Sequence, residues 1–142
     1  MSTVNGSVGD DMEVPGPVVV IADDDPDIRR LVEVAVTRAG AVVGANVADG
    51  AEAWKAISRL HPAMAILDVS MPEKTGLEVC RLVRADTSLT EIKLILLSAA
   101  VHPEAIAAGR AAGADLYSQK PFRLRILQDE IRGLLSIGVT TS

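Results

Sequence analysis

The sequence predicts an α/β fold in which five parallel strands form one sheet with helices on both faces. From Val18 onward, short apolar runs alternate with amphipathic stretches, which is the pattern of successive βα units. A length of 142 residues suits one domain with a single sizeable core. Apolar residues make up 49% of the chain and charged residues 23%, a globular balance. We therefore expect most of the chain to fold as one unit.

The predicted strands are the short apolar runs that lie between turn-forming residues. Most of them are rich in Val, Ile and Leu, which favour strands. Their expected ranges are 18–22, 41–47, 64–68, 93–98 and 115–118.

Five helices are predicted to cover the sheet. In the first, Asp25 is a suitable N-cap, Pro26 suits the first helical position, and Gly40 follows the last turn. The second is expected over residues 50–60, the third from Leu77 through Val83, the fourth over 103–112, and the fifth from Pro121 to Leu135.

Two terminal segments are predicted to lie outside the domain, which should cover residues 18–135. Residues 1–17, MSTVNGSVGDDMEVPGP, are rich in Gly, Ser, Asp and Pro, so we expect a flexible arm. Residues 136–142 are expected to form a short tail, because SIGVTTS is too short and polar for another element. The arm lacks the regions of a secretory signal, and no apolar run approaches the roughly 18 residues that span a bilayer.

Net charge and cysteine content argue against nucleic acid as a direct partner and in favour of a cytoplasmic location. A net charge of −5 argues against direct binding of nucleic acid, which needs a basic face. Cys80 is the single cysteine, and the helical apolar spacing of GLEVCRLV predicts a buried structural thiol. We expect a cytoplasmic protein that binds neither nucleic acid nor a membrane directly.

Reactive side chains follow the predicted strands at their carboxyl ends. In VVVIADDDPD, Asp23 and Asp24 come directly after the first strand. Asp68 ends the third strand, Ser98 ends the fourth, and Lys120 lies just past the fifth. Open parallel sheets bind ligands at this edge, so we expect these side chains to form one site.

The acidic cluster predicts a divalent-metal site. Asp23, Asp24 and Asp68 resist joint ionisation unless a cation neutralises them, and oxygen ligands without cysteine or histidine favour Mg²⁺ or Mn²⁺ over zinc. Asp25 and Asp27 are better explained by the preference of acids for helix N-termini. A lysine and a hydroxyl beside a metal-bound carboxylate suit a phosphoryl group, and the carboxylate can be its acceptor.

These residues resemble the receiver domain of two-component response regulators, of the chemotaxis-regulator kind. The matching pieces are the acidic pair in IADDDP, the acceptor segment ILDVSMPEKTGLE, the hydroxyl in LILLSAA, and YSQKPF before the last helix. Asp68 lies 44 residues after Asp24, 30 before Ser98 and 52 before Lys120, which agrees with the family. The resemblance implies a flavodoxin-like, doubly wound sheet with strand order 2-1-3-4-5.

The resemblance also implies the roles of the acidic residues. Asp68 would accept a phosphoryl group from a histidine of a sensor histidine kinase or a phosphotransfer protein. Asp24 and Asp68 would bind Mg²⁺ directly, with the Ser70 backbone carbonyl as a third ligand. Asp23 would reach the ion mainly through water.

Further residues would sense the phosphoryl group and pass the signal on. Lys120 would pair with one phosphoryl oxygen, and Ser98 would move to bond another while Tyr117 turns inward. The fourth helix, fifth strand and fifth helix would then present an altered surface to an unknown downstream protein or output domain. Ser70 and Ala100 occupy positions that influence how readily water reaches the phosphoryl group, and since neither is acidic or an amide, the phosphoryl lifetime stays open.

The sequence leaves three alternatives to a stand-alone receiver that is not an enzyme. The chain can instead be the receiver portion of a longer regulator with a DNA-binding or enzymatic output domain. A phosphohydrolase with an aspartate nucleophile of the haloacid-dehalogenase type would want an acid where Ser70 stands. A flavin-binding electron carrier has little support, because one Trp, one Tyr and one Phe leave few rings to stack on a flavin.

Overall fold

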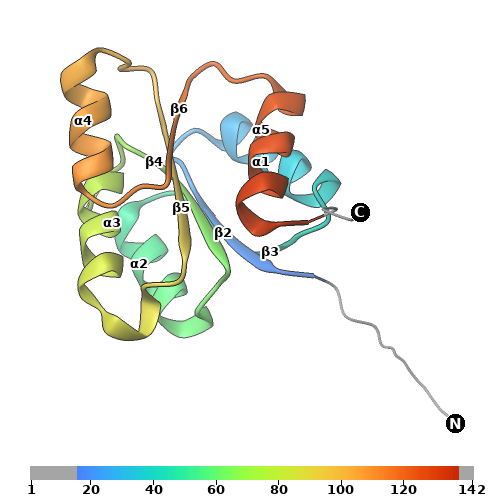
Figure 1. Cartoon of the computed structure of the whole chain (residues 1–142), viewed down its shortest axis with the longest axis horizontal. Coiled ribbons are helices and arrows are strands. Elements are labelled where there is room, and N and C mark those ends of the chain that lie inside the picture. Colours follow the sequence, from blue (N-terminus) through green and yellow to red (C-terminus); the bar gives the residue numbers. More distant parts are fainter. Residues whose placement is uncertain (1–15, 138–142) are drawn as a thin grey trace, which may run out of the picture.

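The computed structural model describes residues 16–137, which form a parallel sheet of five strands between two helical layers (Figure 1). The sheet order is β3-β2-β4-β5-β6, and every neighbouring pair is parallel. In chain order this is 2-1-3-4-5, so the expected topology is confirmed. The strands are β2 (Val18–Ala22), β3 (Val42–Val47), β4 (Met64–Asp68), β5 (Lys93–Ser98) and β6 (Leu116–Gln119).

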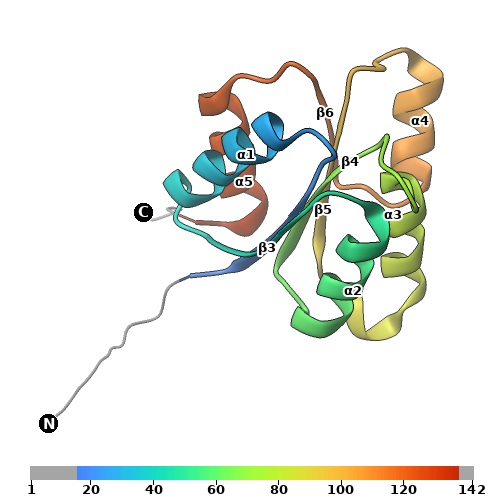
Figure 2. The same cartoon turned by 180° about the vertical axis from the view of Figure 1, so that it is seen from behind.

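Helices cover both faces of the sheet. Figure 2 shows α1 and α5 together on one side and α2, α3 and α4 on the other. The helices are α1 (Pro26–Arg38), α2 (Gly50–Leu60), α3 (Gly76–Ala85), α4 (Pro103–Ala111) and α5 (Leu124–Leu135), with a short 3₁₀ helix at Thr87–Leu89. Within residues 16–137, no helix is long and apolar enough to cross a bilayer.

Two apolar cores lie on the two faces of the sheet, because successive side chains of a strand point to opposite faces. In β2, Val19 and Ile21 join the core under α1 and α5, whereas Val20 and Ala22 join the core under the other helices. Cys80 is fully buried in the second of these cores, as predicted. Burial raises the pKa of its thiol to about 12, so the thiol is unreactive at neutral pH.

Three predicted strand boundaries were off by one residue, because β3 begins at Val42 and β6 runs from Leu116 to Gln119. Ala41 is not in β3, because its N–H donates to the carbonyl of Val36 at the end of α1 (3.1 Å). Asp115 precedes β6, and its carboxylate accepts a hydrogen bond from the Leu94 N–H (2.8 Å). In both cases, the residue before the strand is held by hydrogen bonds to a neighbouring element, and the Asp115 N–H also donates to the Leu94 carbonyl (2.8 Å).

Helix ends also differ from the prediction. Helix α5 begins at Leu124 and not at Pro121, because Arg123 is extended and serves as the N-cap position. Helix α3 begins one residue earlier than predicted, with Thr75 as N-cap in a capping box with Glu78. Helix α4 ends at Ala111, one residue earlier than expected. The predicted arm and tail lie mostly on residues 1–15 and 138–142, outside the described part of the chain.

Strand β3 lies at an edge of the sheet and contains a bulge at Gly44. Val19 pairs with Val43, but Val20 pairs with Ala45, so Gly44 is the extra residue. A side chain at Gly44 would collide with the Val18 side chain, so the close approach there requires glycine.

Candidate functional site

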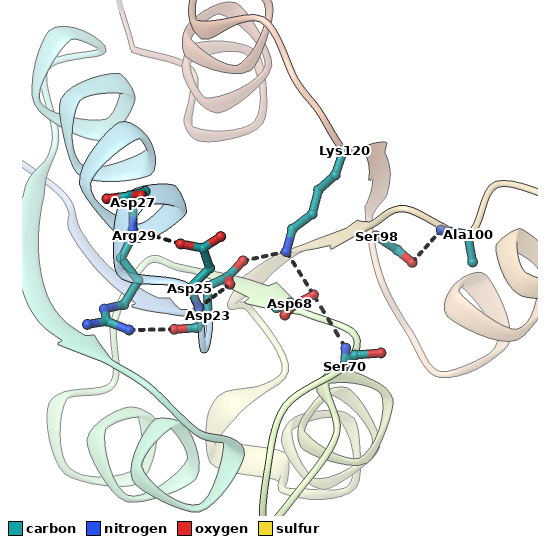
Figure 3. A network of polar contacts seen from close by, with 9 residues as sticks. All are labelled: Asp23, Asp25, Asp27, Arg29, Asp68, Ser70, Ser98, Ala100 and Lys120. Atoms are coloured by element: carbon teal, nitrogen blue, oxygen red, sulfur yellow. Dashed lines mark hydrogen bonds and ion pairs between the residues drawn. The ribbon is translucent and has the colours of Figure 1, made fainter.

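The carboxyl ends of four strands bring the predicted site residues to one edge of the sheet. Asp23 follows β2, Asp68 is the last residue of β4, Ser98 is the last residue of β5, and Lys120 follows β6. Figure 3 shows these side chains around the Lys120 ammonium, which reaches across from the β6 side. A cavity of about 300 Å³ opens here, and it is lined by Asp24, Asp68, Ser70, Ser98, Ala99, Ala100 and Lys120.

The Lys120 ammonium joins two buried carboxylates. Its Nζ lies 2.8 Å from Asp23 Oδ2 and 3.2 Å from Asp68 Oδ1. The Asp23 side chain is 1% exposed and the Asp68 side chain 6%, so both charges are largely removed from water. Burial is unfavourable for carboxylates without partners, and Lys120 partly compensates both of them.

Asp23 lies between β2 and α1 and is held by residues at the start of α1 as well as by Lys120. Its Oδ1 accepts from the Asp25 N–H (2.9 Å), and its backbone carbonyl accepts from Arg29 Nη1 (2.8 Å). Its buried Oδ2 lies 2.8 Å from the Lys120 ammonium and has no other polar partner within residues 16–137. The role of Arg29 was missed from the sequence, where the only hint is its place one turn into α1.

Asp24 completes an acidic cluster and is exposed to solvent. Carboxylate oxygens of Asp23, Asp24 and Asp68 all lie within 4.8 Å of one another. Two of these carboxylates, Asp23 and Asp68, contact the Lys120 ammonium, and the three together carry more negative charge than this one lysine neutralises. This oxygen-only donor set can hold a metal ion and suits a hard divalent cation.

The environment changes the pKa values of the two central groups. Burial, followed by the nearby Asp23 charge, raises the pKa of Asp68 from 3.8 to about 6, against the opposing effect of Lys120. Burial acts to lower the pKa of Lys120, but the hydrogen bond and charge of Asp23, together with Asp68, outweigh it and raise the pKa. At neutral pH the Asp68 carboxylate is therefore ionised beside a firmly protonated lysine.

The remaining predicted residues surround this centre. The Ser70 N–H lies 3.4 Å from Asp68 Oδ1, at the long limit of a hydrogen bond. The Ser98 hydroxyl accepts from the Ala100 N–H (3.0 Å), as Figure 3 shows. The Tyr117 hydroxyl donates to the Ala100 carbonyl (2.6 Å), so Ser98 and Tyr117 hold the same peptide segment.

The loop that follows Asp68 packs closely against neighbouring backbone at two glycines. A Cβ at Gly50, at the start of α2, would collide with the Lys74 carbonyl, and one at Gly76 would collide with the Asp68 carbonyl. The Gly50 N–H also donates to the Pro72 carbonyl (3.2 Å). The contact with Gly50 was not predictable from the sequence, because these residues are distant along the chain and carry no charge pattern.

Sequence comparisons agree with this geometry. The chain matches the response regulator receiver domain family over residues 19–132. It is 36% identical to the transcriptional regulatory protein GltR of Pseudomonas aeruginosa over 124 residues, and this aligned region covers 87% of this chain and 51% of GltR. It is 32% identical over 131 residues to the DNA-binding response regulator MtrA of Mycolicibacterium smegmatis, which covers 84% of this chain and 56% of MtrA. The chain thus spans about half the length of these curated relatives.

Solved structures share the same fold over nearly their whole length. The chemotaxis response regulator CheY4 of Vibrio cholerae superposes with a TM-score of 0.78 at 30% identity, covering 84% of this chain and 99% of CheY4. The receiver domain of NarL from Mycobacterium tuberculosis superposes with a TM-score of 0.80 at 27% identity, covering 87% of this chain and 98% of that domain. The chain belongs to the response regulator receiver domain family and is a receiver domain of two-component signalling.

Proposed function

We propose that Asp68 accepts a phosphoryl group from a histidine of a sensor histidine kinase or a phosphotransfer protein. The observation that carries this proposal is the ionised Asp68 carboxylate in an open cavity, with the Lys120 ammonium 3.2 Å from its Oδ1. An Asp68 oxygen would attack the phosphorus, the P–N bond to histidine would break, and the histidine nitrogen would keep the electron pair. The product is an aspartyl phosphate, a known type of covalent intermediate.

Mg²⁺, or Mn²⁺ in its place, would be held by Asp24, Asp68 and the Ser70 backbone carbonyl, with Asp23 acting mainly through water. When bound, the ion supplies the positive charge that lets two anionic groups approach each other. Within the protein, Asp23 keeps Lys120 in place through the 2.8 Å contact, so that the ammonium stays directed at the acceptor.

The response to phosphorylation would pass through Ser98 and Tyr117. Lys120 would pair with one phosphoryl oxygen, and the Ser98 hydroxyl would leave the Ala100 N–H to bond another. Tyr117 donates to the carbonyl of that same residue, Ala100, so its hydrogen bond would change as well. We propose α4, β6 and α5 as the output surface, where the Ile126 side chain is already 52% exposed.

The chain can act alone or as the receiver portion of a longer regulator, with residues 18–135 as the domain in either case. Its relatives are DNA-binding or transcriptional regulators about twice its length, which supports an output domain. DNA contact would then fall to that domain, because this chain carries a net charge of −5. The buried, unpaired thiol of Cys80 is consistent with the cytoplasm as the place of phosphotransfer.

We propose that the protein is not a turnover enzyme. Ser70 stands two residues after the acceptor, where a phosphohydrolase of the haloacid-dehalogenase type would use an acid. Ser70 and Ala100 instead line the cavity beside Asp68, where they would influence how readily water reaches the phosphoryl group.

Phosphorylation of Asp68 can be tested with a small phosphodonor. Acetyl phosphate and Mg²⁺ are expected to add the mass of one phosphoryl group, located on Asp68 by peptide mapping and removed by base. Chelation should abolish the adduct. Asp68→Asn should gain no mass, whereas Asp27→Asn, at an exposed acid in the first turn of α1, should behave like the unaltered protein. The same adduct on Asp68→Asn would overturn the proposal.

Lys120→Ala is expected to keep Mg²⁺ binding but to lose the conformational response. The carboxylates remain, but the ammonium that contacts both Asp23 and Asp68 is gone. A coupling of about 1 to 3 kcal/mol, equivalent to a 5- to 150-fold population shift, should be largely lost. Amide chemical shifts, or the fluorescence of Trp54, would report the response, with Lys93→Ala at the opposite edge as control. A response of unchanged size would show that Lys120 is not the coupling residue.

A further inference from the structure

The aromatic ring of Tyr117 lies against Gly109 of α4. A Cβ built at Gly109 would lie 2.5 Å from Tyr117 Cδ2 and 2.9 Å from Cε2, closer than real side-chain contacts allow. The ring therefore occupies space that a methyl group at this position would need. Tyr117 is half-buried, and Gly109 is buried on the sheet side of α4.

Glycine in the interior of a helix needs a specific reason. Helix α4 has only nine residues, Pro103–Ala111, and glycine is the least favourable residue for a helix interior after proline. Alanine residues stand at several other positions of the same helix. The contact with the Tyr117 ring is the feature of Gly109 that an alanine could not reproduce.

Tyr117 connects this contact to the phosphorylation site. Its hydroxyl donates to the Ala100 carbonyl (2.6 Å), and the Ala100 N–H donates to the Ser98 hydroxyl (3.0 Å). The Ala100 carbonyl is thus bonded to the Tyr117 side chain, and the Ala100 N–H is bonded to the Ser98 side chain. A continuous path of contacts runs from α4 to the hydroxyl that faces the Asp68 cavity.

We propose that Gly109 is a positioning residue that sets the resting place of the Tyr117 ring, and through Ala100 that of the Ser98 hydroxyl. This inference rests on the switching role proposed above for Ser98 and Tyr117. A methyl group at position 109 displaces the ring and weakens the bond to Ala100. The observed arrangement of the loop after β5 then loses stability, even in the unphosphorylated protein.

A single fluorine label can test the position of the ring. Tyr117 is the only tyrosine of the chain, so 3-fluorotyrosine gives one fluorine resonance. Without phosphodonor, Gly109→Ala is expected to shift this resonance from its position in the unaltered protein. Acetyl phosphate with Mg²⁺ should then move the resonance by a smaller amount than in the unaltered protein. The matched control is Gly133→Ala in α5, where an added Cβ meets no atom within 4 Å, and its resonance should not shift.

The alternative is that Gly109 serves only the packing of α4 on the sheet, since the added Cβ would also lie 3.2 Å from Leu96 Cδ1. A double-mutant cycle separates the two explanations. Gly109→Ala should lower the urea midpoint of the unaltered protein. In a Tyr117→Ala background the ring is absent, so the same substitution should raise the midpoint, because alanine favours a helix interior more than glycine does. Equal changes in both backgrounds, or an unshifted fluorine resonance in Gly109→Ala, would overturn the proposal.

Failure of the proposed function would be recognised separately. Intact mass after acetyl phosphate treatment reports whether Asp68 is the acceptor, independently of the ring. If Asp68 takes up no phosphoryl group, the resonance of the untreated Gly109→Ala protein still tests whether Gly109 positions Tyr117.

Discussion

Asp68→Asn is expected to stabilise the metal-free protein at neutral pH by about 2 to 3 kcal/mol. The pKa of Asp68 is raised from 3.8 to about 6, mainly by burial and then by the Asp23 charge. The difference between these two values corresponds to about 3 kcal/mol of folding free energy, taken as an upper bound. Asparagine removes the charge while preserving the size of the side chain, and Lys120 keeps its 2.8 Å contact with Asp23.

The sign of the pH dependence follows from the raised pKa. Below about pH 4, Asp68 is protonated in both states and its contribution to stability is fully present. As the pH rises from about 4 to about 6, the unfolded state is ionised while the folded state still holds its proton, so this stability is lost progressively. It is gone once the folded state also loses its proton above about pH 6. The advantage of Asp68→Asn should therefore be small at about pH 4 and reach its full size above about pH 6.5.

Urea unfolding in the presence of a chelator, across this pH range, measures the effect. Glu91→Gln, at an exposed carboxylate on the opposite edge, is the control and should show no such pH-dependent gain. Adding Mg²⁺ should reduce the difference in unfolding free energy between Asp68→Asn and the unaltered protein. A cation that binds the folded state should stabilise the unaltered protein more than the variant. A gap that stays constant from acid to neutral pH would show that the Asp68 charge does not destabilise the fold.

Arg84→Met is expected to lower the free energy of unfolding by about 2 to 4 kcal/mol. The Arg84 guanidinium donates to the carbonyls of Gly113 (2.9 Å), Thr90 (3.0 Å) and Ile92 (2.8 Å), and to the Asp115 carboxylate (2.9 Å). Each such bond contributes about 0.5 to 1.5 kcal/mol net, and charged pairs contribute more. Methionine keeps the apolar stem that packs under Gly113 but removes all the donors.

Arg81→Met is the matched control, since Arg81 lies one turn earlier on α3 and its side chain is exposed. Its loss should change the urea midpoint little. Phosphorylation of Asp68, at the other edge of the sheet, should persist in Arg84→Met as long as the protein is folded. Equal midpoints for the two variants would show that the Arg84 hydrogen bonds add no net stability.

The fold was predictable from the sequence because its central strands, β2, β4 and β5, are buried on both faces. The run VVVIA contains no polar residue. A continuous apolar run of this kind distinguishes a central parallel strand from a strand with one solvent-exposed face, in which polar and apolar residues alternate. The boundaries were less predictable, because they depend on individual hydrogen bonds at the ends of the elements, some of them between distant residues. Nothing near Asp115 in the sequence indicates that its carboxylate takes the Leu94 N–H, 21 residues away.

The site was predictable to the extent that it follows from strand ends. Asp23, Asp24, Asp68 and Lys120 meet because parallel strands end at one edge, and their charges make them visible in the sequence. The contact of Gly109 with Tyr117 was not predictable, since a helical glycine shows its purpose only when the neighbouring ring is in place. The charged side chains thus made the site predictable from the sequence, whereas the glycine that contacts Tyr117 gave no such indication.

The bulge at Gly44 has a consequence for how the protein behaves at high concentration. Among residues 16–137, no strand pairs with the outer side of β3, and an unpaired flat edge is a template on which a second chain can add a strand. The extra residue between the pairs Val19–Val43 and Val20–Ala45 breaks the regular repeat of the edge and increases its twist. A foreign strand would meet an interrupted ladder there, so the irregularity protects the protein against edge-to-edge aggregation.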